Sequence, residues 1–283
     1  MERNDKAAIE ALLKRHGFHF SKSMGQNFLI DPAIPYEIAE SSRANEQNGV
    51  LEIGPGIGAL SHELSGKVVA VELDKTLLPI LDETMARFDN FEVVSADILK
   101  TDIPALVREK FAGLTPIVCA NLPYNITTPA ITALIESKCF ESITVLVQKE
   151  VAERLCAAPG TSAYGAFSVF MQYYTEPEYL FAVPRECFEP QPKVTSAVLR
   201  AVVRREPPVE VEDEKFFFRV VYAAFALRRK TLVNSLMTAF GSQLTKEQVT
   251  QAVTSCGLEA NIRGERLGLS EFAALSAEIA ALL

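Results

Sequence analysis

The stretch of sequence that decides the fold runs from Val50 to Gly58 and reads VLEIGPGIG. A short run of β-forming residues leads directly into three closely spaced glycines, and a helix-like pattern follows them. Glycine is used where the backbone must approach a ligand closely or adopt a positive φ. In open α/β sheets, a strand followed by such a loop binds a nucleoside cofactor at the carboxyl edge of the sheet. The stretch therefore predicts an α/β fold with a cofactor site at Gly54 and Gly56.

The first two-thirds of the chain alternates short β-rich runs with helical patterns, which indicates a mostly parallel sheet. The runs are nearly continuously apolar, as is typical of strands that are covered on both faces. We expect seven strands, at residues 50–53, 67–73, 91–96, 116–120, 142–147, 178–183 and 195–203. Helical patterns lie between the earlier strands, at residues 60–64, 75–85, 104–111 and 128–136. No long helix separates the last two strands, which indicates an antiparallel pair at the sheet edge.

The composition changes near Glu206, where Pro207 and Pro208 end the last strand because prolines cannot continue a hydrogen-bonded ladder. Helical patterns replace the β-rich runs beyond this point, at residues 215–227, 231–240, 246–256 and 270–282. We therefore predict two domains, an α/β domain over residues 1–205 and a small all-α domain over residues 206–283.

Composition narrows the class of protein. The chain of 283 residues is 48% hydrophobic and 23% charged, which excludes global disorder. It has no apolar run of about 18 residues for a membrane span, and its first twenty residues lack an apolar signal core. Five scattered cysteines without CxxC spacing and three histidines without HExxH spacing predict a cytoplasmic protein without a metal site. The net charge of −8 argues against a general nucleic-acid coat and leaves room for a local basic groove. We expect a monomer, although no pattern sets the oligomeric state.

Carboxylates end the two strands that follow the glycine loop. Glu72 lies 18 residues after Gly54, near the spacing at which an acidic residue binds ribose hydroxyls. The third strand ends in Asp97 and Ile98 at the same edge. These charges favour the cationic cofactor S-adenosylmethionine (AdoMet) over a pyrophosphate. The spacing of Gly54, Gly56 and Ala59 also satisfies the dinucleotide pattern, so NAD remains open at this point.

The fourth strand ends in Asn121, Leu122, Pro123 and Tyr124. An exocyclic adenine amine is a poor nucleophile because its lone pair is delocalised into the ring. The Asn121 amide oxygen and the Leu122 carbonyl could each accept one N–H and so aim the lone pair at a methyl group. Tyr124 would stack on the base once it is extruded. The alternative is that Asn121 caps the following turn and Tyr124 is an interface aromatic.

At this point the chain resembles a known family, the ribosomal RNA adenine N6-dimethyltransferases, and specifically the KsgA group that acts on small-subunit (16S) rRNA. The resemblance spans nearly the whole chain and is carried by five motifs in order: GQNFLID at 25–31, GPGIG at 54–58, NLPYN at 121–125, FEPQPKVTSAV at 188–198, and RRKTLVNSL at 228–236. It implies a Rossmann-like class I AdoMet-dependent methyltransferase fold for residues 1–205, and a helical domain at 206–283 that recognises rRNA or the ribosome.

The resemblance also implies roles for individual residues. The cofactor would be bound by Asn27, Leu29, Gly54, Gly56, Glu72, Asp97, Ile98 and Asn121. The catalytic set would be Asn121, Leu122, Tyr124 and Phe188, with Phe188 either a second stacking partner or a buried hydrophobe of its proline-rich loop. Neither domain is basic overall, so RNA would be bound by clusters that include Arg185, Lys193, Arg228, Arg229 and Lys230.

The implied activity is dimethylation of two adjacent adenosines in the 3′-terminal hairpin loop of 16S rRNA, within an immature 30S subunit. Two alternatives stay open. One is a ribosome-assembly binding factor with vestigial catalysis. The other is a methyltransferase of the related group that acts on 23S rRNA, which shares the glycine loop and an Asn-x-Pro-Tyr or Asn-x-Pro-Phe motif.

Overall fold

The computed structural model describes residues 6–20 and 25–283, and its main element is a seven-stranded sheet. The strand order is β4-β3-β2-β5-β6-β9-β7. The strands are β2 (Asn48–Ile53), β3 (Lys67–Glu72), β4 (Phe91–Ser95), β5 (Thr115–Asn121), β6 (Ser142–Gln148), β7 (Thr175–Val183) and β9 (Ser196–Val203). The first five pair in parallel, and β9 pairs antiparallel to β6. The predicted fold, with seven strands in a mostly parallel sheet, is confirmed.

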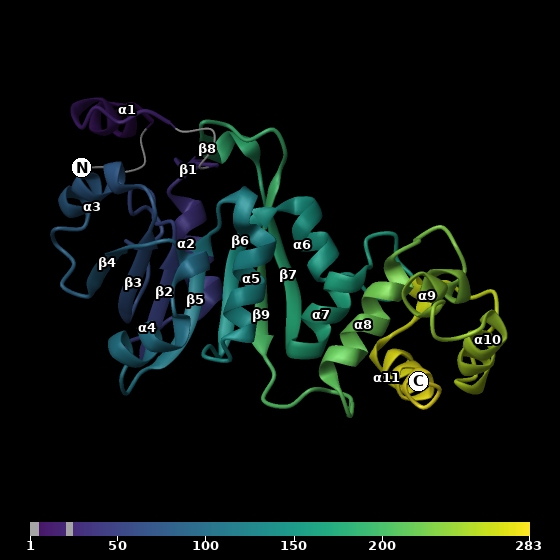
Figure 1. Ribbon diagram of the computed structural model, residues 1–283. Coiled ribbons are helices and arrows are strands. Elements are labelled where there is room, and N and C mark those ends of the chain that lie inside the picture. The colour runs from purple at the N-terminus through teal and green to yellow at the C-terminus, as the bar shows by residue number, and fades with distance from the viewer. Residues whose placement is uncertain (1–5, 21–24) are drawn as a thin grey trace. The chain divides into compact units, whose positions relative to one another are not determined.

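Helices cover both faces of the sheet, with α5 in front of it and α2 behind it in the view of Figure 1. They are α2 (Ala33–Ser42), η2 (Lys75–Leu77), α3 (Leu78–Thr84), η3 (Ile98–Lys100), α4 (Ile103–Lys110), η4 (Tyr124–Ile126), α5 (Thr127–Glu136) and α6 (Lys149–Leu155). Burial on both faces explains why central strands such as β2 are buried along their whole length.

The helix predicted at residues 60–64 is wrong, because this segment consists of turns. Gly54, Gly56 and Gly58, which precede this segment, have φ values of 66°, 59° and 84°, so a right-handed helix cannot begin before residue 59. The turns that follow contain short-range bonds, such as that from the Glu63 N–H to the Leu60 carbonyl. The glycine loop therefore leads into a compact series of turns.

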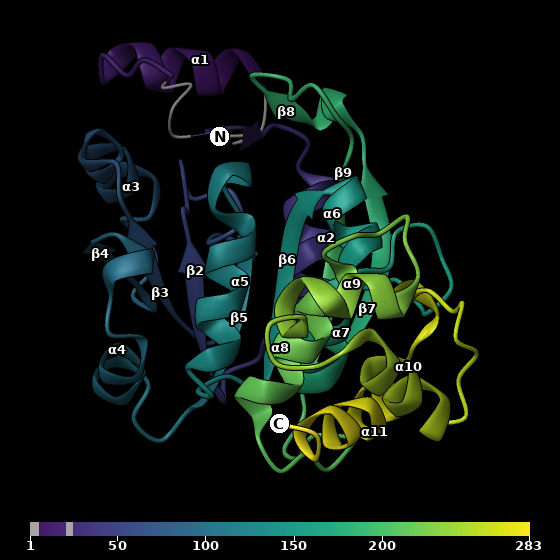
Figure 2. The same ribbon diagram turned by 45° about the vertical axis from the view of Figure 1, so that its right-hand side comes forward.

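A small two-stranded sheet and α1 (Lys6–Arg15) lie at the same end of the main sheet, as Figures 1 and 2 show. The strands of the small sheet are β1 (Phe28–Leu29) and β8 (Phe188–Glu189), which pair antiparallel. The Ile30 N–H extends the pairing by donating to the Cys187 carbonyl. An ion pair of 2.9 Å between Lys6 and Glu189 joins α1 to β8. These contacts bring the N-terminal segment beside a loop that is about 160 residues later in the sequence.

The chain divides into two compact units. The first comprises the described residues of Met1–Ala152 and Glu178–Val203, and the second comprises Glu153–Pro177 and Arg204–Leu283. The predicted boundary lies between residues 205 and 206. The structure differs from it because residues 153–177, which contain α7 (Ala166–Tyr174), also belong to the second unit. The physical reason is packing, since Val169 and Tyr173 of α7 are buried in the apolar cluster of the C-terminal helices.

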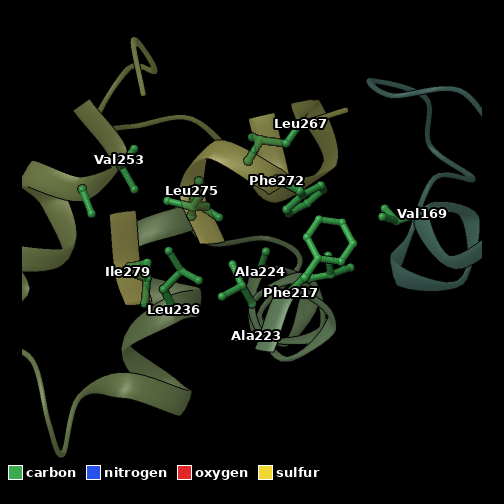
Figure 3. Packing of buried hydrophobic residues seen from close by; sticks show 14 of the residues in the cluster. Val169, Phe217, Ala223, Ala224, Leu236, Val253, Leu267, Phe272, Leu275 and Ile279 are labelled. Carbon is green, nitrogen blue, oxygen red and sulfur yellow. The ribbon is translucent and has the colours of Figure 1, made fainter. Parts of the chain in front are cut away.

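The second unit is built on α8 (Glu214–Phe225), α9 (Leu232–Phe240), α10 (Lys246–Ser255), η6 (Gly264–Arg266) and α11 (Leu269–Ala280). Side-chain caps begin three of these helices: Asp213 caps α8, Thr231 caps α9, and Thr245 caps α10. Figure 3 shows Phe217 of α8 and Phe272 of α11 in one buried cluster. Among the residues that the structure describes, no helix is long and apolar enough to cross a membrane.

Candidate active site

The carboxyl ends of β2, β3, β4 and β5 open into one pocket, which residues 25–29 also line. This is the edge at which ligands of open α/β sheets bind. The pocket is lined by most of the predicted site residues: Asn27, Leu29, Gly54, Gly56, Glu72, Asp97, Ile98, Asn121, Leu122 and Tyr124. The topology therefore brings together side chains from five separate segments of the chain.

Glu72 ties the end of β3 to the glycine loop. Its side chain is 6% exposed, and its Oε1 accepts the Asp74 N–H at 2.8 Å. The backbone amides of Gly56 and Leu73 also favour the charged form of this carboxylate. Burial raises the pKa of Glu72 above its ordinary value, although these backbone amides oppose the shift. Glu72 is thus a fixed acceptor at the pocket wall, with the geometry to receive ligand hydroxyls.

Asp97 begins the 3₁₀ turn η3, where its Oδ1 accepts the Leu99 N–H at 3.0 Å. Its Oδ2 lies 3.5 Å from the exposed Lys100 ammonium. Ile98 is buried beside it and supplies an apolar surface to the same wall. Asp97 can therefore present a hydrogen-bond acceptor, and Ile98 a hydrophobic surface, to a heterocycle.

Glu52, in the strand before the glycine loop, was not predicted as a site residue. It lines the pocket, is 1% exposed and accepts a hydrogen bond of 2.5 Å from the Ser61 hydroxyl. Burial raises its pKa to about 8, and the nearby charge of Glu72 adds to the shift. The Glu52 side chain is therefore mostly protonated at pH 7. Its position inside a strand, and not at a strand end, explains why the pattern alone did not single it out.

The pocket is acidic. Four carboxyl groups line it, those of Glu52, Glu72, Asp74 and Asp97, and no Lys, Arg or His is found among the described lining residues. A pyrophosphate would find no cation on these walls, so the dinucleotide alternative does not fit. A positively charged cofactor with ribose hydroxyls fits the acceptors that are present.

Asn121 is the last residue of β5, and its amide is held by the N-terminal segment. The Asn121 Nδ2 donates to the Asn27 carbonyl at 3.2 Å. This bond fixes the orientation of the amide, in which Oδ1 is the atom that can accept hydrogen bonds. The next peptide is fixed by the Leu122 N–H, which donates to the Leu146 carbonyl at 3.1 Å. The strand end therefore carries an oriented amide on a rigid backbone.

Tyr124 lines the pocket from η4, and it is partly buried. Its hydroxyl lies 2.6 Å from the Ser196 hydroxyl, at the start of β9. Burial raises the pKa of Tyr124, so the phenol is neutral at physiological pH. Its ring is available to the pocket as an aromatic surface.

The prediction that Phe188 stacks on a target base is not supported by its position. Its side chain is 0% exposed and packs in an apolar cluster with Leu29, Cys187 and Val198. It is not among the described residues that line the pocket. The pairing of β1 with β8 turns this side chain inward, so the alternative of a buried hydrophobe describes it better.

The predicted RNA-binding residues are exposed. Arg185 lies 3.8 Å from Glu186, and Lys193 lies on the loop that leads to β9. In the second unit, the Arg228 guanidinium donates to the Ser162 carbonyl and lies 3.7 Å from a carboxylate oxygen of Glu265. Arg228 is therefore partly neutralised within its own unit. Arg229 and Lys230 follow it on the same exposed segment.

Gln26 is a further contact that the sequence analysis missed. Its amide nitrogen donates to Asp74 Oδ2 at 2.8 Å and joins the N-terminal segment to the end of β3. Its place inside the GQNFLID motif, next to Asn27, is the signal that could have identified it.

Comparison with known proteins agrees with this geometry. The family model described as Ribosomal RNA adenine dimethylase matches residues 17–278. A protein of Geobacillus sp. (strain WCH70) named Ribosomal RNA small subunit methyltransferase A is 48% identical over 94% of this chain and 93% of its own length. A protein of the same name from Streptococcus thermophilus is 48% identical, over 96% of both chains.

Two solved structures are similar over most of the chain. The 23S rRNA methyltransferase ErmE aligns with a TM-score of 0.69 at 26% identity, covering 89% of this chain and 99% of its own. A dimethyladenosine transferase from Plasmodium falciparum aligns with a TM-score of 0.74, covering 90% of this chain and 98% of its own, and at 23% identity it supports the fold alone. The acidic pocket, the oriented Asn121 amide and the match over nearly the whole sequence lead to one assignment. This chain belongs to the ribosomal RNA adenine dimethylase family.

Proposed function

We propose that this protein uses AdoMet to dimethylate the exocyclic N6 amines of two adjacent adenosines in the 3′-terminal hairpin loop of 16S rRNA. Family membership and the names of the relatives at 48% identity support a small-subunit rRNA substrate. The 23S enzyme ErmE is more distant, at 26% identity. The single observation that carries the chemistry is the hydrogen bond from Asn121 Nδ2 to the Asn27 carbonyl.

That hydrogen bond prepares an acceptor for the target amine. With Nδ2 engaged, Asn121 Oδ1 can accept one N–H of the adenine N6 group, and the Leu122 carbonyl can accept the other. Two acceptors on one side of the nitrogen draw its lone pair out of conjugation and direct it away from the strand end. After a first methylation one N–H remains, so one of these acceptors can still position the amine for the second transfer.

The cofactor site fits AdoMet, whose bound form supplies an electrophilic methyl group. Glu72 would accept the ribose hydroxyls, and Asp97 with Ile98 would receive the adenine. Asn27, Leu29, Gly54 and Gly56 would contact the remainder of the cofactor from residues 25–29 and the glycine loop. The chain's own contribution to the rate is then positioning and exclusion of water, with no dedicated base required.

The RNA surface is a separate part of the proposal. Arg185 and Lys193 flank β8, which pairs with the pocket-lining segment β1, so their exposed charges would contact phosphates near the target base. Arg229 and Lys230 would bind a second RNA element from the helical unit. We expect binding to weaken steeply with salt, because phosphate contacts release counterions.

We further propose that the substrate is the rRNA within an immature 30S subunit, in the cytoplasm, and that the protein acts as a monomer. Neither unit is rich in basic residues, which favours recognition of a folded particle over binding of arbitrary RNA. Docking on such a particle would also serve subunit assembly without methyl transfer. The two roles are separable by removing catalysis alone.

The test compares the wild-type protein with Asn121→Ala, using tritiated AdoMet and three acceptors: immature 30S particles, 16S transcript and 23S transcript. We expect methylation of the 30S particles by the wild type, at most weak methylation of 23S RNA, and no methylation by Asn121→Ala. AdoMet affinity should remain within a few-fold, because Glu72 and Asp97 are intact. Asn90→Ala is a matched control, since Asn90 is exposed and donates to the Gly66 carbonyl away from the pocket.

Unchanged turnover in Asn121→Ala would refute the catalytic role of the amide. Preferential methylation of 23S RNA would instead refute the proposed substrate. Co-sedimentation of the inactive variant with immature 30S particles is the expected result for a protein that also docks during assembly.

A further inference from the structure

We propose that Ser196 is a positioning residue for the methyl-transfer reaction, which orients the aromatic ring of Tyr124 toward the target base. The inference rests on the function proposed above, in which Tyr124 stacks on an extruded adenine. It is carried by the hydrogen bond of 2.6 Å between the Ser196 and Tyr124 hydroxyls.

Ser196 is a rigid anchor. It is the first residue of β9, paired in register with Gln148 of β6, and its side chain is 0% exposed. The rest of β9 reads AVLRAVV and is mostly buried and apolar, so the hydroxyl is not explained by the core packing of the strand. Most buried hydroxyls in proteins make a hydrogen bond, and Tyr124 provides the partner of this one.

Tyr124 needs such an anchor because of where it lies. It begins η4, a 3₁₀ turn of three residues that follows the end of β5, and it is partly exposed. A single short turn does not by itself fix the direction of a long side chain. The bond to Ser196 joins the tip of the ring to a strand two positions away in the sheet, across the end of β6.

The bond constrains the plane of the ring as well as its axis, because a phenolic oxygen donates and accepts hydrogen bonds preferentially near the plane of its ring, whichever hydroxyl is the donor. A ring held at Cα and at the hydroxyl presents a fixed face to the pocket that Asn121 also lines. Ser196 itself is not among the described residues that line this pocket. Its removal should therefore affect the base and leave the cofactor contacts unchanged.

The experiment is a double-mutant cycle on the full chain with immature 30S particles. Ser196→Ala and Tyr124→Phe should each lower kcat by about 10- to 100-fold, as expected when a reacting group is misplaced. The double variant should be no slower than the slower single variant, because both remove the same bond. Ser196→Thr keeps the hydroxyl and should recover most of the activity lost in Ser196→Ala. AdoMet affinity should stay within about twofold in all four, because the cofactor contacts are unaltered.

A matched control separates positioning from stability. Thr144 is another strand hydroxyl that is 0% exposed, and its Oγ1 has no hydrogen-bond partner among the described residues. Thr144→Val should retain wild-type kcat. A purely structural role for Ser196 would lower the melting temperature of Ser196→Ala and leave its kcat unchanged well below that temperature.

A kcat equal to that of the wild type in Ser196→Ala or in Tyr124→Phe would overturn the proposal. It would also be overturned if the fold-decrease in kcat of the double variant equalled the product of the two single decreases. If Ser196→Ala does not fold, Tyr124→Phe alone decides, since it keeps the serine and the ring.

The ring can also be observed without substrate, by fluorine NMR of 3-fluorotyrosine at position 124. One sharp resonance is expected in the wild type and a broadened or divided one in Ser196→Ala, and identical spectra would refute the anchor. Failure of the wild type to methylate 30S particles would count against the proposed function, while the NMR result would still decide the role of Ser196.

Discussion

The buried carboxyl of Glu52 leads to a specific prediction about stability and pH. Glu52 is 1% exposed, and its pKa is raised by burial to about 8 from an ordinary value of 4.5. We consider the substitution Glu52→Gln, which keeps the shape of the side chain and the acceptor for the Ser61 hydroxyl and removes the titration. The protein is free of AdoMet in this experiment.

The folded protein holds the Glu52 proton more tightly than the unfolded chain does. The stabilisation from this group is therefore complete below about pH 4.5 and is lost as the pH rises through about 8. A pKa difference of this size corresponds to about 5 kcal/mol, at 1.36 kcal/mol for each pH unit. About 3 kcal/mol of this is already lost at pH 7. The variant lacks this dependence.

The assay is urea unfolding between pH 5 and pH 9, followed by far-UV circular dichroism because the chain has no tryptophan. The free energy of unfolding of Glu52→Gln minus that of the wild type should rise across this range by about 4 kcal/mol. Taking the difference removes the contributions of the groups that titrate in both proteins and do not interact with Glu52. Glu46→Gln, at an exposed position, is the control and should follow the wild type.

Parallel stability curves for the wild type and Glu52→Gln would refute the reasoning. They would mean that Glu52 is ionised in the folded protein, with water or a cation reaching it. A variant that is much less stable at pH 5 would show instead that the protonated carboxyl makes a hydrogen bond that an amide cannot replace.

Two further predictions concern cofactor binding and the helical unit. Glu72→Gln should weaken AdoMet binding by about 10- to 100-fold in calorimetry, because a charged acceptor becomes a neutral one; an unchanged affinity would exclude Glu72 as a ribose acceptor. Phe217→Ala should lower the free energy of unfolding by about 3–5 kcal/mol in urea titrations, since Phe217 is 0% exposed in the core of the second unit. A loss below about 1 kcal/mol would show that this core readily repacks.

The main sheet could be predicted from the sequence because the patterns that indicate its strands are local. Most of its strands are nearly continuous apolar runs, and the three glycines after β2 all have positive φ. Acidic residues at the strand ends could be assigned to one edge because parallel strands end together. The predicted boundary near Glu206 lies close to Arg204, where the second unit resumes, but α7 joins that unit through buried aromatic contacts that no local pattern reveals.

The missed features of the site depend on contacts between distant residues. The strands β1 and β8 have two residues each, too few for any periodicity, and they form only because they pair with one another. Their pairing buries Phe188, which motif resemblance had assigned to the base. The raised pKa of Glu52 is likewise a property of the folded surroundings and not of the strand that carries it.

Long-range contacts also hold the side chains that we propose to act in methyl transfer. Each is hydrogen-bonded to a residue outside its own motif, since Asn121 donates to the Asn27 carbonyl and the Tyr124 hydroxyl bonds to the Ser196 hydroxyl. The four carboxyl groups face inward on the pocket walls, and protonation of Glu52 removes one negative charge from them near pH 7. We infer that these long-range contacts fix the amide and the ring together at the edge of the sheet where the acidic pocket opens.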